Sequence, residues 1–506
     1  MLEARLTDLT EFAAKRFGSR DAFTAPGEGT YNFVQINELV ARCAGGLAKS
    51  GIQAGDRVVL HLPNCLQWIV FYHAIARMGG VVIPANFLLS VEEIHFIVAD
   101  SQAKALIVPA ERLTHFESLD LQKIVVGDHP IALNYLELCT ADPVAPAERH
   151  SDDLFTIGYT SGTTGKPKGA MLTHGNIFGS LAATATVHVR RESDVVISSL
   201  PFPHVYGNIV MNAVFLAGTK LVTTQRFEPG EALRLIAEHG ATLFEGVPTM
   251  YYQMLAHPGI LAADLSSLTR CTVGGQTMPT AKIDEVTRRF NCPLLELWGM
   301  TEVAGPAITH SPYWAARHGS IGMLVPGMEA RIESLEDSSK DAPFGQAGEL
   351  LVRGAQVTIG YWNNTQATAD AFVNDGWLST GDIAWRDKDG YYYVVDRKKD
   401  MIITAGYNIY PAELEQVIAS HPAVAMTAVA GVHDEEKGEL AYAFIVLHRD
   451  MTCDEQDILM HCRKYLAAYK VPRRILFVES LPKTSTGKIL RRTLRDDVER
   501  ISQQAV

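Results

Sequence analysis

The sequence has little of the features that mark membrane, disulfide-rich or nucleic-acid-binding proteins. Its most apolar long region, residues 68–89, is broken by His73, Arg77 and Pro84, as in a buried helix followed by a strand. The seven cysteines form no CxxC pair and no zinc-spaced cluster, which is typical of reduced thiols. With 45 basic against 57 acidic residues, the net charge of -12 gives no support for general nucleic-acid binding. Charge runs through residues 1–18, where a signal peptide would be apolar, so we expect a cytoplasmic protein without an integral membrane segment.

A chain of 506 residues is longer than one hydrophobic core usually organises, so more than one domain is expected. Its first two thirds alternate between short β-rich runs and stretches with helical periodicity. Such alternation indicates βαβ units and a largely parallel sheet covered by helices. The predicted strands are residues 57–60, 105–108, 123–126, 195–199 and 221–224, and the clearest amphipathic helices are residues 231–239 and 281–290.

The last third of the chain has a different texture. Residues 345–395 form short β segments with many turns, and Asp389-Gly390 between two of them is a hairpin signal. A charged cluster at residues 396–400 follows. We therefore predict an N-terminal domain over residues 1–396, a hinge at 397–400 and an α+β domain over 401–506. The elements expected in this last domain are a helix at 411–420, strands at 424–430 and 441–447, a helix at 455–468 and a strand at 475–478.

The segment Tyr159–Gly169 carries the strongest chemical signal. It holds three glycines, four Ser or Thr hydroxyls and two lysines between a predicted strand, residues 154–158, and an expected helix. Glycines let the backbone wrap so that N–H groups point at one anion, while hydroxyls and lysines add donors and positive charge. Lys166 is followed by Pro167, so the segment does not have the spacing of a Walker A loop. Taken alone it could also be an ordinary polar loop.

Four further blocks follow in order: Trp298-Gly-Met-Thr-Glu302, Ser379-Thr-Gly-Asp382, DRKKDMIITAG at residues 396–406, and Pro482-Lys-Thr-Ser-Thr-Gly-Lys488. Together with the Gly-rich loop they resemble the motifs of the adenylate-forming acyl-CoA synthetase superfamily. The resemblance implies an α/β N-terminal domain, with helix-covered and largely parallel sheets and a small β-rich subdomain, and a smaller mobile α+β domain. It also implies an AMP-forming acid–thiol ligase that uses ATP, Mg²⁺ and coenzyme A.

The resemblance assigns catalytic roles to three residues. Lys488 would bridge the substrate carboxylate and the α-phosphate of ATP, where removing such a donor typically costs about 10²–10³ in rate. Thr301 would touch the same phosphate. His204, in the segment Pro201-Phe-Pro-His-Val-Tyr-Gly207, would lie near the carboxylate, either as a base or as a gate for the thiol. Lys399 falls at the hinge position of the family.

The nucleotide and its metal would be held by matching positions in the other blocks. Glu302, with Thr160, is the expected Mg²⁺ ligand, because a hard carboxylate suits a hard ion. Asp382 would accept both ribose hydroxyls, and Arg397 would contact the same sugar. The remaining ATP- or AMP-binding residues implied are Ser161, Gly162, Thr163, Thr164, Gly165, Lys166, Gly275, Trp298 against the adenine, Gly299, Met300, Thr301 and Lys488.

Coenzyme A is the acceptor that the resemblance favours. Gly406 would line the pantetheine tunnel, and Tyr469 and Arg473 match positions that contact the nucleotide end of CoA. Val471 stands where some relatives carry a cation. No carrier-protein segment of the LGGxS type follows the last block, so a free-standing ligase is expected.

The identity of the acid is the least determined feature. The implied pocket residues are mostly small or apolar and offer no charge to an α-amino group, so an amino acid is not expected. Medium- or long-chain fatty acids are favoured, with aryl or alicyclic acids as the alternative. Gln276 could either shorten the pocket or bind a polar substituent. The implied acyl-pocket residues are Tyr206, Asn208, Met211, Val247, Gly274, Gln276, Val303 and Ala304.

Two other functions remain open from the sequence. The adenylate could be passed to an acceptor other than CoA, or the chain could bind a nucleotide without turning it over. The second is disfavoured because Lys166, Glu302, Asp382, Arg397 and Lys488 are all present. The expected partners are the acid, ATP and CoA, with no nucleic acid. Members of the family are often homodimers, and no motif decides this point here.

Overall fold

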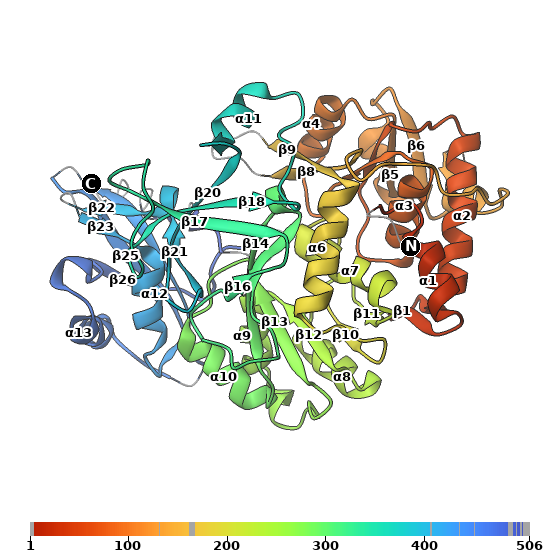
Figure 1. The fold of residues 1–506 in the computed structure, drawn as a ribbon. Helices are drawn as coiled ribbons and strands as arrows, with labels where there is room; N and C mark the ends of the chain where they lie inside the picture. Colours follow the sequence, from red (N-terminus) through yellow and green to blue (C-terminus); the bar gives the residue numbers. More distant parts are fainter. Residues whose placement is uncertain are drawn as a thin grey trace.

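The computed structural model describes residues 5–130, 132–160, 167–404, 407–434, 436–449, 451–483, 489–491, 493–495 and 498. Figure 1 shows a large domain that runs from red to cyan along the sequence and a smaller domain, in blue, at one end. The structure confirms the predicted fold class, an α/β domain with mixed sheets followed by a smaller α+β domain.

In the described part of the chain, seven strands form the first sheet of the large domain, in the order β7-β6-β5-β3-β4-β8-β9. Neighbouring strands are parallel except β8 and β9, which are antiparallel. The strands are β3 (Arg57–Leu60), β4 (Val81–Pro84), β5 (Ala105–Pro109), β6 (Gln122–Val126), β7 (Leu133–Asn134), β8 (Leu154–Thr160) and β9 (Lys168–Thr173).

The second sheet has nine described strands in the order β16-β15-β14-β13-β12-β10-β11-β1-β2. Its centre is parallel, and antiparallel pairs occur at both edges. The strands are β1 (Asp21–Ala25), β2 (Gly29–Asn32), β10 (Val195–Ile197), β11 (Lys220–Val222), β12 (Leu243–Gly246), β13 (Arg270–Gly274), β14 (Leu294–Met300), β15 (Gly305–Thr309) and β16 (Met323–Leu324).

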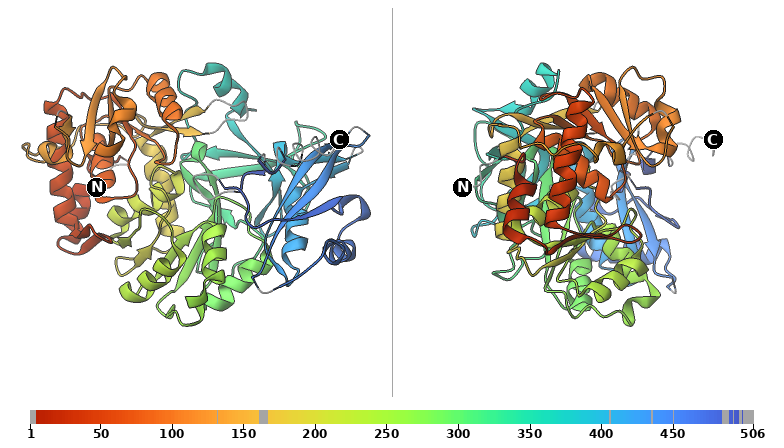
Figure 2. Two further views of the ribbon diagram at one scale, coloured as in Figure 1. Left: turned by 180° about the vertical axis from the view of Figure 1, so that it is seen from behind. Right: turned by 90° about the vertical axis from the view of Figure 1, so that its right-hand side faces the viewer.

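Helices α3 (Leu66–Arg77) and α7 (Val205–Ala217) are buried almost all round and belong to one core that includes residues of both large sheets. A helix that is apolar on every side requires such a position. Figure 2 shows the N-terminal helices on the outer side of this core. The other helices of the large domain are α1 (Leu9–Phe17), α2 (Phe33–Lys49), α4 (Val91–Ser101), α5 (Tyr135–Leu138), α6 (His174–Val187), α8 (Pro229–His239), α9 (Pro248–Ala256), α10 (Thr280–Phe290) and α11 (Thr365–Ala371).

The third sheet is antiparallel and corresponds to the turn-rich region of the sequence. It contains β17 (Met328–Ser334), β18 (Gly348–Gly354), β19 (Phe372–Val373), β20 (Trp377–Arg386) and β21 (Tyr392–Arg397). Strands β20 and β21 pair around Asp389-Gly390, which confirms the predicted hairpin.

In the part of the smaller domain that the structure describes, helices α12 and α13 pack on a mostly antiparallel sheet. Its helix α12 contacts α10 of the large domain, where the Thr280 N–H donates to Gln416 Oε1 over 2.9 Å. The predicted elements of this domain are confirmed, with ends shifted by up to a few residues. They are α12 (Pro411–Ala419), β24 (Val424–Asp434), β25 (Gly438–Leu447), α13 (Glu455–Tyr465) and β26 (Arg474–Phe477). Two further strands, β22 (Ile402–Thr404) and β23 (Tyr407–Ile409), were not predicted.

One sequence-based expectation about secondary structure is wrong. The segment after the Gly-rich loop is a strand, β9, which pairs antiparallel with β8, and the expected helix begins only at His174. Ala170 and Leu172 are buried on one face of the strand, as a period of two requires. The Thr173 side chain and Asn176 then form a capping box that starts α6. The loop therefore joins two antiparallel strands.

Apolar segments of membrane-crossing length do not occur among the helices that the structure describes.

Candidate active site

A cavity of about 880 Å³ opens where the three sheets of the large domain meet the smaller domain. Its walls come from the carboxyl end of β4, from β8, from the end of β14 and the turn after it, and from β20 and β21. Leu490 of the smaller domain also lines it. Ligands of open α/β sheets bind at the carboxyl ends of strands, which makes this cavity the candidate active site.

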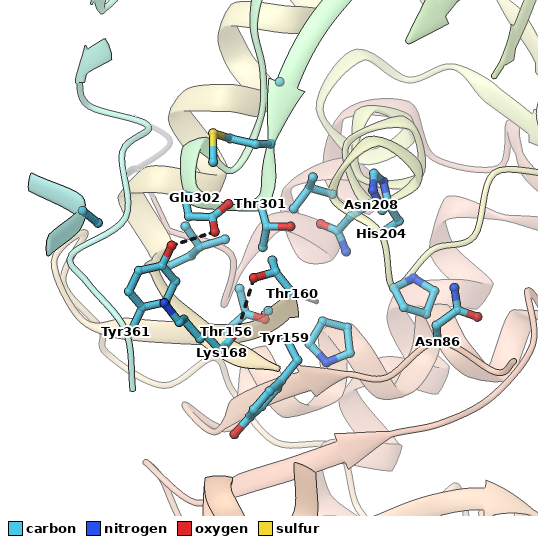
Figure 3. Close-up of a pocket in the computed structure, with 18 of the residues that line it drawn as sticks. Asn86, Thr156, Tyr159, Thr160, Lys168, His204, Asn208, Thr301, Glu302 and Tyr361 are labelled. Atoms are coloured by element: carbon cyan, nitrogen blue, oxygen red, sulfur yellow. Dashed lines mark hydrogen bonds between the residues drawn. The ribbon is translucent and has the colours of Figure 1, made fainter. Parts of the chain in front are cut away.

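One wall is built around the buried carboxylate of Glu302 (Figure 3). The Tyr361 hydroxyl donates to Glu302 Oε1 over 2.9 Å, and Lys168 Nζ lies 5.5 Å from the centre of the Tyr361 ring. Burial, and then the adjacent carboxylate, raise the pKa of the Tyr361 hydroxyl, so it remains a proton donor at physiological pH. This bond fixes the direction of the carboxylate.

Glu302 lies on the short turn η3 (Thr301–Val303) between β14 and β15, and two close approaches shape that turn. A Cβ atom at Gly299 would lie 2.0 Å from the Gly305 carbonyl oxygen, so only glycine allows the two strands to come this near. A Cβ atom at Gly158 of β8 would lie 2.6 Å from Thr301 Cγ2. The absence of a side chain at Gly158 therefore allows Thr301 to lie against β8, the strand that precedes the Gly-rich loop.

A second wall includes Thr380, Gly381 and Arg397, and behind it lies Asp382, which is 5% exposed and is not itself among the described lining residues. Trp298 Nε1–H donates to Asp382 Oδ2 over 2.7 Å, and Arg397 Nε lies 3.3 Å from Asp382 Oδ1. Asp382 and Arg397 are opposite each other in the β20–β21 ladder, which explains their proximity. An ionised carboxylate can accept several hydrogen bonds at once, so this side chain can serve a ligand as well as the protein.

The cavity side near α7 is polar. His204 caps α7, and its Nδ1 accepts the Tyr206 N–H over 3.4 Å, so the neutral ring carries its proton on Nε2. The Tyr72 hydroxyl donates to Asn208 Oδ1 over 3.0 Å, and both residues line the cavity. Figure 3 shows His204 and Asn208 side by side on the α7 side of the cavity.

The structure gathers many of the residues predicted for the nucleotide around this one cavity. Gly381 and Thr380 line it, whereas the predicted residues Asp382 and Trp298, which are bonded to each other, are not among its described lining residues. Gly275 is not among the described residues of the wall. The predicted residues that line the cavity are Thr160, His204, Asn208, Gly299, Met300, Thr301, Glu302 and Arg397.

Several predicted residues lie outside the described parts of the chain. They are the loop residues Ser161, Gly162, Thr163, Thr164, Gly165 and Lys166, together with Gly406 and Lys488. Lys399 falls in the short turn η4 (Lys398–Asp400), directly after β21.

The residues predicted for the acyl pocket are mostly packed into the core. Asn208 lines the cavity, whereas Met211, Val303 and Ala304 are fully buried. The Tyr206 hydroxyl points to Thr272 Oγ1 at 2.6 Å, at the end of a buried network. The other three members, Val247, Gly274 and Gln276, are likewise not among the described residues of the cavity wall.

The residues predicted for CoA lie on the smaller domain. Tyr469 is 42% exposed and stacks on Tyr407, with ring centres 4.7 Å apart. The Arg473 side chain is exposed, and its backbone N–H donates to the Ala441 carbonyl. Neither predicted residue lines the cavity in this arrangement of the domains.

Sequence reasoning missed Tyr361 and Tyr72 as residues of the wall. Lys168, the second lysine of the Gly-rich segment, was expected to add positive charge there, and it lines the cavity. Tyr361 and Tyr72 lie in no motif, and only the fold brings them to Glu302 and Asn208.

No cluster of three or more His, Cys, Asp or Glu side chains in the described residues could hold a metal ion. Mg²⁺ usually takes one or two carboxylates and completes its shell with phosphate oxygens and water. A single carboxylate oriented by Tyr361 therefore suits a metal that arrives with a phosphate group.

These features define an enzyme site for a nucleotide and a second substrate, and the chain belongs to the AMP-binding enzyme family. The family model for the AMP-binding enzyme matches residues 10–362, and the model for the AMP-binding enzyme C-terminal domain matches residues 413–488.

Among curated relatives, a long-chain-fatty-acid–CoA ligase of Bacillus subtilis (strain 168) is 35% identical, over 98% of this chain and 94% of the relative. A feruloyl-CoA synthase of Amycolatopsis sp is also 35% identical, over 93% and 94%.

Among solved structures, ATP-bound MatB from Rhodopseudomonas palustris superimposes with a TM-score of 0.90 at 28% identity, covering 99% of this chain and 100% of that one. The apo form of MatB superimposes with a TM-score of 0.82 at 27% identity and the same coverage. The predicted relationship to adenylate-forming acyl-CoA synthetases is confirmed.

Proposed function

We propose that this protein is an AMP-forming acid–CoA ligase. The observation that carries the proposal is a single cavity where Thr301, Glu302 and Arg397 meet the end of the Gly-rich loop's strand, beside the Asp382 carboxylate. Of the two curated relatives, one is named a long-chain-fatty-acid–CoA ligase and the other a feruloyl-CoA synthase.

The reaction would run in two steps. A carboxylate oxygen attacks the α-phosphorus of ATP, the bond to the bridging oxygen breaks, and diphosphate leaves. The CoA sulfur then attacks the acyl carbon of the adenylate, AMP leaves with the bonding electron pair, and the thiol proton passes to solvent or to a base. A thiol with a pKa of about 8.5 needs little help, so His204 could serve as either base or gate.

The residues of the chain would hold the reactants for the first step. Asp382, fixed by Trp298 and Arg397, accepts the ribose hydroxyls, and Thr301 contacts the α-phosphate. Lys488 bridges the carboxylate and the same phosphate. When bound, Mg²⁺ would be held by Glu302, with Thr160, and would neutralise charge on the phosphate oxygens.

We propose medium- or long-chain fatty acids as the substrates. Support comes from the identity with the Bacillus relative, which is named for long-chain fatty acids. An aryl acid is the second candidate, because Tyr72 and Asn208, which line the cavity, carry polar groups that can hydrogen-bond a ring substituent.

The second step would involve the smaller domain. We propose that residues 1–396 and 401–506 are the two domains and that residues 397–400, with Lys399, are the hinge. Gly406, Tyr469 and Arg473 would then meet CoA in a second orientation. The seven cysteines, all free thiols, support a cytoplasmic location, and light scattering would test whether the protein forms a homodimer.

The experiment that tests the function is AMP release by purified protein with ATP and Mg²⁺. Octanoate, palmitate, benzoate, cyclohexanecarboxylate and a hydroxycinnamate are compared, each with and without CoA. CoA-dependent turnover concentrated on the straight-chain acids supports the proposal. Turnover on a ring acid would correct only the acid, AMP release that ignores CoA would point to another acceptor, and no turnover on any acid would refute the ligase.

A further inference from the structure

Asp396 occupies an unusual place at the junction of the two domains. It is the last residue but one of β21, is 4% exposed, and lies directly before the proposed hinge. Its Oδ2 accepts the Ala412 N–H over 2.8 Å, at the first turn of α12 in the smaller domain. Tyr410, the N-cap position of α12, makes no side-chain cap bond, so Asp396 supplies the cap from the other side of the hinge.

A guanidinium from the smaller domain faces the same carboxylate. Arg491 Nη1 lies 3.7 Å from Asp396 Oδ1 and 3.6 Å from Asp400 Oδ2. Arg491 also holds Glu415 of α12 with N–O distances of 2.8 to 3.2 Å. Burial raises the pKa of Asp396 to about 6, while the charge of Arg491 acts in the opposite direction. Losing either partner would leave a buried charge uncompensated.

The order of these residues along the chain shows which of their contacts cross the proposed hinge. Asp396 precedes residues 397–400, whereas Asp400, Ala412, Glu415 and Arg491 lie within or after them. A rotation about the hinge would keep Arg491 with Glu415 but would separate Asp396 from the α12 amide and from Arg491. Asp396 therefore makes contacts that belong to the present orientation alone.

Two observations connect the present orientation of the domains with the nucleotide site. Leu490 lies in the wall of the cavity, and in the sequence it follows Lys488 by two residues. The chain matches the ATP-bound form of MatB better than the apo form, by TM-scores of 0.90 and 0.82.

We propose that Asp396 is a positioning residue that caps α12 across the hinge and pairs with Arg491, and so holds the smaller domain in the orientation for acyl-adenylate formation. The inference rests on the proposed two-step ligase reaction. In this proposal, Asp396 sets how much of the enzyme is in the orientation for each half-reaction, and it contacts no substrate.

The test compares three variants. Asp396→Ala removes both the cap and the charge, and Asp396→Asn keeps an acceptor for the Ala412 N–H but removes the charge opposite Arg491. The matched control is Asp454→Ala, because Asp454 caps α13 by accepting the Asp457 N–H over 2.9 Å and both residues lie after the hinge. Single-turnover diphosphate release measures adenylation, and thioester formation from synthetic acyl-AMP measures the second step.

Asp396→Ala should lower the ratio of adenylation to thioester formation by about 5–30-fold, the factor expected when one helix cap and one buried charge contact are lost. Asp396→Asn should give a smaller change in the same direction, and Asp454→Ala should leave the ratio at the wild-type value. An unchanged ratio in folded Asp396→Ala, or equal loss of both half-reactions, would overturn the proposal.

A second measurement is independent of turnover. Spin labels are placed at Leu136→Cys and Met460→Cys, which are 66% and 58% exposed, after the partly exposed Cys139 and Cys453 are changed to serine. Asp396→Ala should shift the distribution of label distances, and Asp454→Ala should not. A distribution that is the same in both variants refutes the positioning role of Asp396. This measurement does not depend on whether the wild type activates an acid, so failure of the positioning role and failure of the proposed function are distinguishable.

Discussion

The two sides of the cavity are built on different principles. The nucleotide side is held by hydrogen bonds between distant segments, such as Trp298 with Asp382 and Tyr361 with Glu302. On the side proposed for the acyl group, Met211 and Ala304 are packed into the core that includes α7, and Val303 is packed into a second core cluster. Polar groups recur in fixed sequence blocks because each must make one particular bond, whereas packing can be achieved by many combinations of side chains. Reaction class can therefore be inferred from the nucleotide side, and acid preference depends on the other.

Among the substitutions that test the difference between the two sides, Lys488→Ala is expected to have the largest effect. Losing a donor shared by carboxylate and α-phosphate should slow adenylation by about 10²–10³-fold for every acid. Thioester formation from supplied acyl-AMP should largely survive. Diphosphate release and thioester formation are measured separately, with Lys464→Ala on exposed α13 as the control. Equal loss of both steps would contradict the assignment.

Tyr361→Phe tests the carboxylate on the nucleotide side. Without the 2.9 Å bond, Glu302 loses its orienting donor, and the Mg²⁺ concentration for half-maximal rate should rise by about 5–30-fold. Tyr393→Phe is the matched control, because its hydroxyl also donates to a carboxylate, Asp387, over 3.3 Å. A similar Mg²⁺ requirement in both variants would remove Tyr361 from the metal site.

Asn208→Ala tests the acyl side. The substitution removes the acceptor of the Tyr72 hydroxyl and enlarges the cavity, so the ratio of kcat/KM for octanoate to that for a hydroxycinnamate should change by about 10-fold. The KM for ATP should stay at the wild-type value, because Asn208 is assigned to the acid and Asp382 to the nucleotide. A changed KM for ATP with an unchanged acid ratio would show that the two sides are not separate.

Glu296→Gln is expected to affect stability alone. Glu296 lies on β14, two residues before Trp298, and burial raises its pKa to about 8 while the Gly319 N–H that it accepts lowers it. Because the folded state binds this proton more tightly than the unfolded state, wild-type stability is lost as pH rises from about 4.5 to 8, by ~1.4 kcal/mol for each pH unit in that interval. The melting temperature of the variant should fall less between pH 6 and 8.5 than that of the wild type. Parallel pH profiles would contradict this.

Much of the fold could be predicted because strands and helices follow local periodicity. The strand at Arg57–Leu60 was predicted to the residue, and the hairpin at Asp389-Gly390 came from one turn signal. The segment after the Gly-rich loop was misread as helix, because its role as the partner of β8 depends on pairing over the loop and not on its own few residues.

The candidate site divides in the same way. Glu302, Asp382 and Arg397 could be found because they belong to sequence blocks, and the structure brings all three to one region. Tyr361 and Tyr72 could not be found, since each acts on a residue far away in the sequence. Asp396 belonged to a recognised block, but its bond to the Ala412 amide across the hinge is a property of the assembled domains.

The missing side chain at Gly158 has a practical consequence for inhibitor work. An added methyl would meet only the Cγ2 atom of Thr301, the end of a side chain that can turn, and no backbone atom within contact distance. Gly158→Ala should therefore leave the scaffold and the outer surface intact while displacing the Thr301 hydroxyl. The variant would serve as a control protein in binding assays. A compound that binds Gly158→Ala as tightly as the wild type does not depend on the Thr301 hydroxyl and binds elsewhere on the protein.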